Sequence, residues 1–329
     1  MRGRPWFQVF GFLAAALVAA ASAVAGDSPL AEATRQFDAG NYQQAVTILR
    51  SALEQDQQAA GLHYWLGRCY FELRDFDRAV TTAEHAVQIE PNNSEYHDWL
   101  GRAYGRKAEQ AGWFSGFSLA KKTRREFEEA VRLNPSSLQA QRDLIEFYLE
   151  APGIVGGGDD KARRQIEVLA AIDAVEGHLG RADFWMDQKR PELAEAEYRL
   201  VMEAKLKRAD PYFEVAKFYM SRSDAGRMEE AVEAAARVEA SDRRLSFYRG
   251  VVWVLAGNRL EEAEPLLKLY LETVPQCSDL PSHAAAREWL GRLYERQRKC
   301  AAAAEQYRAA LKIEPRRKSA QEALRHVCK

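Results

Sequence analysis

The sequence is poor in cysteine and has almost no net charge. Only four of its 329 residues are cysteine, which excludes a small scaffold held together by many disulfides. The 47 basic and 48 acidic residues leave a net charge of −1, whereas a strongly basic nucleic-acid-binding protein needs a clustered positive excess. An apolar fraction of 47% excludes wholesale disorder. Length alone suggests about two ordinary domains.

Long hydrophobic runs are also absent, except for one at the amino terminus. Arg2 and Arg4 precede a largely apolar stretch over residues 6–25, which ends in small residues around Ala25. This order of features is typical of a secretory signal peptide. We expect residues 1–25 to be such a signal, cleaved near Ala25, that exports the chain to the bacterial periplasm or the medium. Retention as a membrane anchor is the alternative, and no later stretch approaches the length of a membrane span.

Motifs that carry catalysis or metal binding are missing as well. The sequence contains no H-E-x-x-H, C-x-x-C or G-x-S-x-G pattern. Of its six histidines, His63 and His97 are 34 residues apart, at one position of an internal repeat. A packing role that recurs with the repeat explains them. The sequence therefore predicts no catalytic residue, no metal site and no cofactor.

What the sequence does contain is a repeated phrase. Trp-Leu-Gly-Arg begins at residue 65 and returns at residues 99 and 289, each time followed by one further residue and a tyrosine. The first two copies are 34 residues apart. In the first copy Gly67 and Ala79 are small, which suits two helices that approach closely. Pro91 then ends the second helix, because proline removes an amide donor.

This pattern resembles the tetratricopeptide repeat, a 34-residue helix–turn–helix unit. The resemblance implies an all-α fold, a right-handed α-solenoid of about eight such units over residues 28–315. The tail, residues 316–329, carries Ala320, Leu324 and Val327 along one helical face. It is expected to be the capping helix that a solenoid needs to cover the apolar face of its last unit.

The repeat departs from the family pattern at one position. The family's tryptophan usually lies three residues before the leucine, where this chain has His63, His97 and Arg287. In this chain the tryptophan comes directly before the leucine instead. Between the second and third copies of the phrase, only the spacing of alanine and aromatic residues marks the units.

Two units carry additional residues between their helices, near 105–122 in the third and near 151–160 in the fourth. Their apolar residues are Trp113, Phe114 and Phe117 in the first insertion and Ile154 and Val155 in the second. Both insertions fall at turns along one edge of the stack, so they are expected to be neighbours. Three interpretations fit. The aromatic residues pack with the second insertion as a small local core, they form a lip that docks a partner, or they contact a membrane surface beside four basic residues.

The second insertion is also rich in glycine. Gly153 and Gly158 have the glycine spacing of the phosphate-binding motif G-x-x-x-x-G-K-[ST]. Asp159 and Asp160 stand where that motif needs its lysine and its hydroxyl residue. Two carboxylates there would repel phosphate, so nucleotide binding is not expected.

The resemblance also points to a binding surface, because in this family the first helix of each unit lines a concave groove that binds peptides or protein segments. Mapped through the phrase, the groove residues are Tyr64, Arg68 and Phe71 in the second unit, Arg102 and Arg106 in the third, and Arg292 and Arg296 in the eighth. Arginines can hold carboxylates of a ligand with paired hydrogen bonds. The alternative is that they pair with acids of the chain itself, such as Glu72, Asp98 and Glu295. Chaperone-binding members carry Asn and Lys at such positions, which argues against that function here.

The four cysteines contain one candidate pair. An exported chain meets an oxidising compartment. Cys300 begins the second helix of the eighth unit, and Cys328 ends the capping helix, which should run antiparallel to it. The sequence therefore predicts a Cys300–Cys328 disulfide, with Cys69 and Cys277 unpaired.

These features together predict a non-enzymatic scaffold, exported to the cell envelope, that binds a peptide or a segment of another protein in its groove. One alternative is a subunit of an envelope assembly or secretion complex that docks through the insertion edge. Another is an enzyme whose site lies in the insertions, although no catalytic constellation is present there. No nucleic acid is expected as a partner, and membrane contact is expected to be transient at most.

Overall fold

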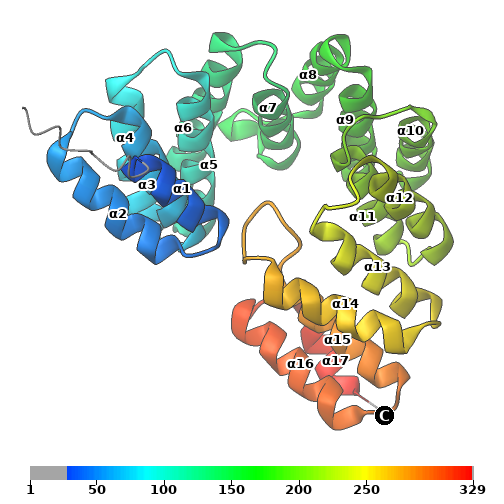
Figure 1. Cartoon of the computed structure of the whole chain (residues 1–329). Helices are drawn as coiled ribbons and strands as arrows, with labels where there is room; N and C mark the ends of the chain where they lie inside the picture. The colour runs from blue at the N-terminus through cyan, green and yellow to red at the C-terminus, as the bar shows by residue number, and fades with distance from the viewer. Residues whose placement is uncertain (1–27, 328–329) are drawn as a thin grey trace, which may run out of the picture.

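The computed structural model describes residues 28–327. Within this range the chain forms 17 α-helices and one short 3₁₀ helix, and no strand. Successive helices pair into eight helix–turn–helix units, and α17 follows the eighth unit alone (Figure 1). The all-α repeat fold is thus confirmed. The helices are α1 Pro29–Asp38, α2 Tyr42–Gln55, α3 Ala60–Glu72, α4 Phe76–Ile89, α5 Ser94–Gln110, α6 Trp113–Leu133, α7 Leu138–Glu150, η1 Gly153–Val155, α8 Asp159–Ile172, α9 Ala174–Asp187, α10 Pro191–Glu203, α11 Asp210–Ser221, α12 Ala225–Val238, α13 Arg244–Ala256, α14 Leu260–Thr273, α15 His283–Arg296, α16 Cys300–Ile313 and α17 Lys318–His326.

A recurring turn joins the two helices of most units. One residue in the left-handed region follows the first helix, as at Gly40, Arg74, Lys189, Ser223, Gly257 and Arg298. In two units an aspartate then caps the second helix: Asp75 accepts the amide of Arg78 at 3.1 Å, and Asp224 accepts the amide of Arg227 at 3.0 Å. Such caps satisfy amides that the first turn of a helix leaves free.

Glycine brings the two helices of a unit into close contact. A Cβ atom on Gly101 of α5 would lie 2.6 Å from the ring of Phe127 in α6, and one on Gly291 of α15 would lie 2.5 Å from the ring of Tyr307 in α16. Both rings are buried. The glycine of the repeated phrase therefore lies at a helix crossing, as its sequence position predicted.

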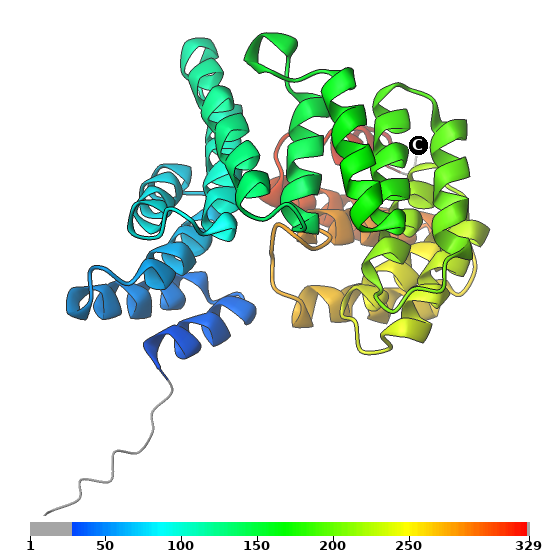
Figure 2. The ribbon, with the colours of Figure 1, turned by 90° about the horizontal axis from the view of Figure 1, so that it is seen from above.

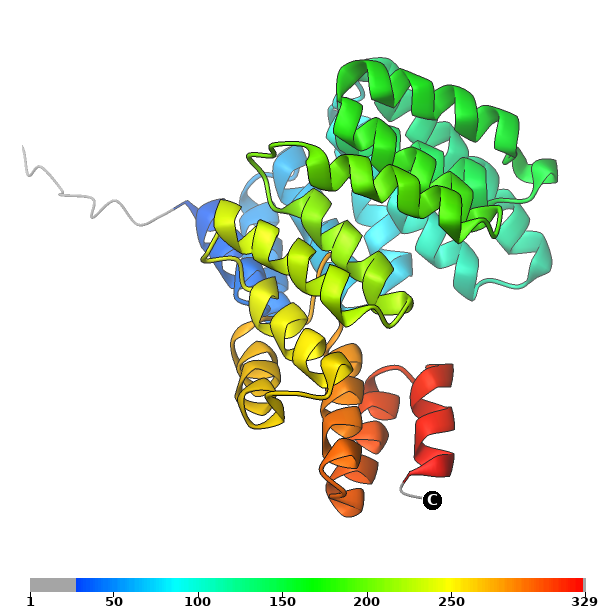
Figure 3. The same ribbon diagram turned by 90° about the vertical axis from the view of Figure 1, so that its right-hand side faces the viewer.

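The hydrophobic core follows the seams between the units. One group of buried side chains links α1 to α5, a second links α6 to α9 through η1, and a third extends from α9 to α16. Each unit therefore buries its apolar face against the next one, which is how a solenoid gains stability. α17 lies at the end of the stack (Figure 3). It buries Ala320, and Leu324 and Val327 pack against the third group. The predicted cap is thus present over the described part of the tail.

The insertion of the third unit is not a separate loop. α5 continues to Gln110 and α6 begins at Trp113, so the additional residues lengthen both helices (Figure 2). α6 has 21 residues, whereas the second helices of the other units have 13 or 14. The additional residues predicted near 105–122 thus flank the turn between the two helices, but they are helical and do not form a loop. The segment contains no proline, and residues such as Leu119, Ala120 and Lys121 are good helix formers that extend α6.

The insertion of the fourth unit contains η1 and lies against α6. Arg124 of α6 donates from Nη1 to the carbonyl oxygen of Val155 at 3.4 Å. The two insertions are therefore neighbours, as predicted. Across residues 28–327, none of the helices combines the length and the hydropathy that crossing a membrane requires.

Candidate functional site

The concave side of the stack encloses a hollow of about 920 Å³, called the chamber here. Its walls come from α7, α9 and α11, with further residues from the start of α13 and from the connection between α14 and α15. Charged residues dominate the walls. The carboxylates are Asp143, Glu146, Glu150, Glu176, Asp183, Asp187, Asp210, Glu214 and Asp279, and the cations are Arg142, Arg208, Lys217 and Arg244.

All four chamber cations are already in ion pairs. Glu176, only 2% exposed, lies between Arg208 at 2.8 Å and Arg142 at 3.4 Å. The other two cations pair with acids nearby, Lys217 with Glu214 at 3.6 Å and Arg244 with Asp210 at 2.9 Å. The chamber therefore has no spare positive charge for an anionic ligand.

Several chamber carboxylates, in contrast, make no ion pair. Among the described residues, Glu146, Glu150 and Asp183 have neither a hydrogen bond nor an ion pair through their side chains. The loss of solvent inside the chamber raises the pKa of Asp183 to about 7, against the opposing charge of Arg142. The pKa of Glu146 is raised as well, first by burial and then by the charge of Glu150. At neutral pH Asp183 is therefore only partly ionised, and a cation placed beside these carboxyl groups would favour their charged forms.

Arg102, a predicted groove residue, pairs with acids of the chain. Its guanidinium contacts Asp143 at 2.6 Å and Asp98 at 3.2 Å, and Asp279 lies 4.0 Å away. Asp98 is 5% exposed, and its Oδ1 atom has no hydrogen-bond partner. Burial and the charge of Asp143 raise the pKa of Asp98 to about 8, against the effect of Arg102.

The groove residues predicted in the second unit form part of the packing. Tyr64 and Phe71 are 6% and 9% exposed. Tyr64 stacks on Tyr96 with ring centres 5.0 Å apart, so it offers little surface to a ligand. Arg68 lies over aromatic rings, including those of Trp65 at 4.4 Å and Trp99 at 4.5 Å.

The remaining predicted groove arginines also have contacts within the chain. Arg106 pairs with Glu109 at 2.7 Å, and Arg292 pairs with Glu288 at 2.6 Å. Arg296 donates to the carbonyl of Leu255 at 3.2 Å. Pairing with the chain's own groups is therefore the arrangement in the structure, although several partners differ from those expected.

The insertion edge divides into a packed part and an exposed part. Val155 is buried, and Phe117 packs against the same core group. Trp113, Phe114 and Ile154, by contrast, are 81%, 87% and 71% exposed. The interpretation that all five form a local core is therefore correct only for Phe117 and Val155. The other three project from the first turn of α6 and from η1, where no element of the described chain covers them.

The histidines of the repeat contact backbone carbonyls, which is a more specific role than the packing role that the sequence predicted. Nε2 of His97 contacts the carbonyl of Pro91 at 3.0 Å, and Nε2 of His63 contacts that of Gln57, also at 3.0 Å. Gln141 makes the equivalent contact to a carbonyl six residues earlier. A polar side chain at this position thus ties the first helix of three units to the turn before it, whereas Arg287 of the eighth unit donates to Gln306 at 3.2 Å.

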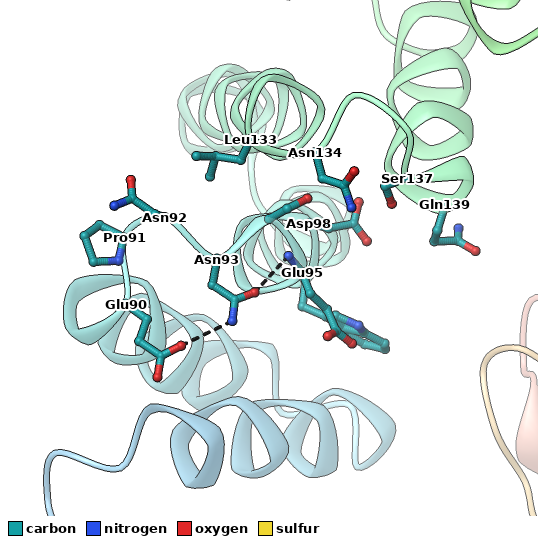
Figure 4. A pocket seen from close by; sticks show the side chains of 12 residues that line it. Glu90, Pro91, Asn92, Asn93, Glu95, Asp98, Leu133, Asn134, Ser137 and Gln139 are labelled. Carbon is teal, nitrogen blue, oxygen red and sulfur yellow. Dashed lines mark hydrogen bonds between the residues drawn. The ribbon is translucent and has the colours of Figure 1, made fainter. Parts of the chain in front are cut away.

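A second hollow, of about 950 Å³, lies where the connections between units two, three and four meet (Figure 4). Its polar groups include the cap of α5: Asn93 accepts the amide of Glu95 at 3.1 Å and donates to Glu90 at 3.3 Å. These cap groups satisfy one another. In the described part of the chain no three His, Cys, Asp or Glu side chains are placed to hold a metal ion.

The cysteines agree with the sequence where the structure describes them. Cys69 and Cys277 are free thiols. Cys300 begins α16 and takes part in a disulfide. Its predicted partner Cys328 lies outside the described residues, so the pairing itself stays a prediction.

Sequence reasoning missed the connection between α14 and α15, residues 274–282, called the clasp here. It is the longest connection in the described chain, and it reaches from the seventh unit to the first three (Figure 1). Tyr42 donates its hydroxyl to the carbonyl of Gln276 at 2.7 Å. Glu72 accepts the amide of Ser278 at 3.0 Å and its hydroxyl at 2.7 Å. Two prolines, at 275 and 281, were the available signal of an extended segment.

Comparisons with known proteins agree with this architecture. Sequence models described as tetratricopeptide repeat match residues 36–103, 220–277 and 278–322, which together make up just over half of the chain. A search of curated proteins finds no match.

Among solved structures, the chain resembles the APC/C hetero-tetramer Cut9–Hcn1, with a TM-score of 0.51 and 14% identity over 92% of this chain and 55% of that one. It also resembles TTC0263, a thermophilic TPR protein of Thermus thermophilus, with a TM-score of 0.48 and 22% identity over 58% of this chain and 97% of that one. A third is YrrB, described as a TPR protein with an unusual peptide-binding site, with a TM-score of 0.35 and 15% identity over 67% and 89%. At these identities the likeness concerns the fold.

Proposed function

This chain belongs to the tetratricopeptide repeat family, and on that premise we propose that it is an exported, non-enzymatic scaffold that binds a segment of another protein on its concave face. The observation that carries the proposal is the charge of the chamber, where nine carboxylates face four cations. A volume of about 920 Å³ is within the range of sites that take up several side chains.

The chamber favours a segment that presents lysine or arginine. Its own cations are consumed by ion pairs, whereas Glu146, Glu150 and Asp183 have none. A basic side chain placed between them would supply the missing counter-charge, and an acidic one would be repelled. Complementarity of this kind contributes mainly to partner choice and to the rate of association.

Crosslinking from inside the chamber tests this proposal. A photo-crosslinking residue at Met186, which lines the chamber and is 38% exposed, is expected to capture the partner in cells. The same residue at Leu200 of α10 is the control, since Leu200 is 43% exposed but lies outside the chamber. The captured protein should be lost when Asp183 and Glu146 are changed to Asn and Gln. Equal capture from both positions, or capture that ignores these carboxylates, would contradict the proposal.

Export is a separate part of the proposal and has its own test. Residues 1–25 lie outside the described residues, so their sequence alone supports it. The full chain with a carboxy-terminal tag should fractionate with the periplasm or the medium, and its new amino terminus should follow Ala25. A chain without residues 2–25 should stay in the cytoplasm. Retention of the intact chain in the cytoplasmic fraction would overturn this part.

A second candidate function is that of a subunit in a larger envelope assembly. It is favoured by the exposed apolar side chains of Trp113, Phe114 and Ile154, which are of the kind that anchor protein interfaces. Elution of the native protein in a large complex, lost when Trp113 and Phe114 are both changed to alanine, would support it. A monomer in native extracts would exclude an obligate subunit.

A further inference from the structure

The clasp is an irregular piece of the chain, with a turn at Ser278 and Asp279, that lies on the concave surface of the first three units. Three side chains of that surface, Tyr42, Glu72 and Arg102, face it, and they come from α2, α3 and α5. Tyr42 and Glu72 are separated from the clasp residues that they bind by more than 200 positions in the sequence. The contact is therefore one between distant parts of the stack and not a local turn.

We propose that the surface around Tyr42, Glu72 and Arg102 is a peptide-binding site, that the clasp is its internal occupant, and that an external segment binds there by displacing the clasp. The external ligand is a segment with a hydroxyl residue followed directly by a carboxylate, the chemistry that Ser278 and Asp279 present in a turn. This site lies in the first three units and takes an acidic segment, so it goes beyond the scaffold function proposed for the chamber.

The contacts define what such a segment must offer. Tyr42 donates to a backbone carbonyl and Glu72 accepts a backbone amide, so this part of the recognition is independent of side-chain identity. The hydroxyl of Ser278 donates a hydrogen bond to the second carboxylate oxygen of Glu72. Burial raises the pKa of Glu72, and the hydrogen bonds from Ser278 oppose that rise. A segment without the hydroxyl would leave a partly buried carboxylate oxygen without its partner, which is costly.

Arg102 supplies the preference for a carboxylate after the hydroxyl residue. Asp279 lies 4.0 Å from its guanidinium and is 58% exposed, whereas Asp143 and Asp98 hold that guanidinium at shorter distances. The Arg102–Asp279 pair is loose and solvent-accessible, and such pairs contribute little to stability. A ligand carboxylate can therefore take the place of Asp279 without disturbing the buried pairs.

The clasp is held in a way that permits exchange. Gln276, Ser278 and Asp279, in the middle of the clasp, are exposed, and polar contacts join them to the first three units. The bonds of Ser278 to Glu72 lie at the surface, and the Tyr42–Gln276 bond is partly buried. The ends of the clasp are held more firmly, since Val274 is buried in the third core group and Leu280 packs against it. Segments with few buried apolar contacts and exposed hydrogen bonds open at the low end of the free-energy range of a protein. One close contact also makes the fit depend on shape, because a Cβ atom on Gly40 would lie only 2.5 Å from Cβ of Pro275.

The test uses a fluorescent peptide with the clasp sequence, Val-Pro-Gln-Ala-Ser-Asp-Leu-Pro-Ser, in which alanine replaces the cysteine. Its binding is measured by fluorescence anisotropy to the mature chain and to an open variant, in which residues 275–281 are replaced by the same number of Gly and Ser residues. A tethered occupant competes at an effective concentration of the order of 1 mM. The open variant is therefore expected to bind the peptide at least about tenfold more tightly than the unchanged chain.

Two controls tie the binding to the proposed contacts. Glu72→Gln in the open variant, and a peptide with Ala-Asn in place of Ser-Asp, should each weaken binding at least about fivefold, as expected for the loss of one hydrogen bond to a charged group. Absence of peptide binding by a folded open variant, equal binding to both chains, or equal binding of the altered peptide would each overturn the proposal.

Hydrogen exchange of the unchanged chain provides a measurement that does not depend on the folding of the open variant. Excess peptide should speed exchange of the clasp amides, Ser278 above all, and unchanged exchange at saturating peptide would count against displacement. Ser278 and Asp279 also line the chamber, so the two tests are distinguished by their carboxylates: capture from Met186 depends on Asp183 and Glu146, and peptide binding depends on Glu72. Failure of the peptide to bind would therefore leave the scaffold proposal standing, and failure of that crosslink would leave this one standing.

Discussion

The guanidinium of Arg292 lies 4.5 Å from the centre of the Trp289 ring, three residues earlier on α15. The same pair recurs in the other two copies of the Trp-Leu-Gly-Arg phrase, at 4.4 and 4.9 Å. Residues three apart are neighbours on a helix surface. The phrase thus encodes a stacked tryptophan–arginine pair on the first helix of three units, which leaves only part of each guanidinium for other contacts, such as that of Arg102 with Asp279.

The pair should show measurable coupling. A double-mutant cycle with Trp289→Leu and Arg292→Met is expected to give an interaction free energy of about 0.5–1 kcal/mol, the range for a partly exposed cation–π contact. Urea unfolding of the four proteins measures it. Arg296 lies one helical turn beyond Arg292 and donates to the carbonyl of Leu255 instead. Arg296→Met combined with Trp289→Leu should therefore give additive effects. If the effects of Trp289→Leu and Arg292→Met were also additive, the stacking would contribute nothing to stability.

Two glycines of α5 make a matched pair for testing the helix crossing. Gly101→Ala forces a methyl group into the ring of Phe127, with 2.6 Å available, and overpacking of this kind costs about 1–3 kcal/mol. Gly105→Ala places the same methyl at 3.6 Å from Thr123, an ordinary contact. There the gain in helix propensity, up to about 1 kcal/mol, should dominate. Thermal unfolding should therefore shift in opposite directions for the two variants, and a loss of stability in both would disprove the packing argument.

The fold could be predicted from the sequence because its information is local. The units repeat a spacing of alanine and aromatic residues, with the glycine of the phrase in three of them, and the structure has a helix pair for each unit. The chamber and the clasp could not be predicted in this way. They depend on the curvature accumulated over several units, which brings Ser278 next to Glu72, and no pattern within one repeat specifies that approach. Trp113 shows the intermediate case, since its presence in the insertion was predicted and its exposure was not.

The exposed aromatic residues of the insertion edge should be dispensable for folding. Changing Trp113 and Phe114 together to alanine is expected to alter the free energy of unfolding by less than about 0.5 kcal/mol, as for other surface positions. Phe127→Ala, on the same helix but 6% exposed, should cost about 3–5 kcal/mol. Urea unfolding compares the two. A large loss in the double variant would mean that these side chains are covered in solution, by a second copy or by the rest of the chain.

Asp98 and Asp75 should affect the pH dependence of folding stability in opposite directions. The pKa of Asp98 is raised from 3.8 to about 8, chiefly by burial. Below about pH 4 the carboxyl is protonated in both states; between about pH 4 and 8 only the unfolded chain releases the proton, so rising pH favours unfolding. The pKa of Asp75 is lowered, first by the hydrogen bond from the Arg78 side chain, so its contribution is present above the unfolded pKa and is lost as the pH falls.

The variants Asp98→Asn and Asp75→Asn test these opposite pH dependences. Asparagine mimics the protonated carboxyl, so Asp98→Asn should match the unchanged chain near about pH 4. It should then become the more stable protein as the pH rises to about 8, with a slope of at most about 1.4 kcal/mol per pH unit for one proton. Asp75→Asn should instead be the less stable protein at about pH 7, with a difference that shrinks in acid. Urea unfolding across this pH range gives both curves. A flat difference for Asp98→Asn would show that Asp98 is ionised in the folded chain, in which case Arg102 and not burial dominates its protonation.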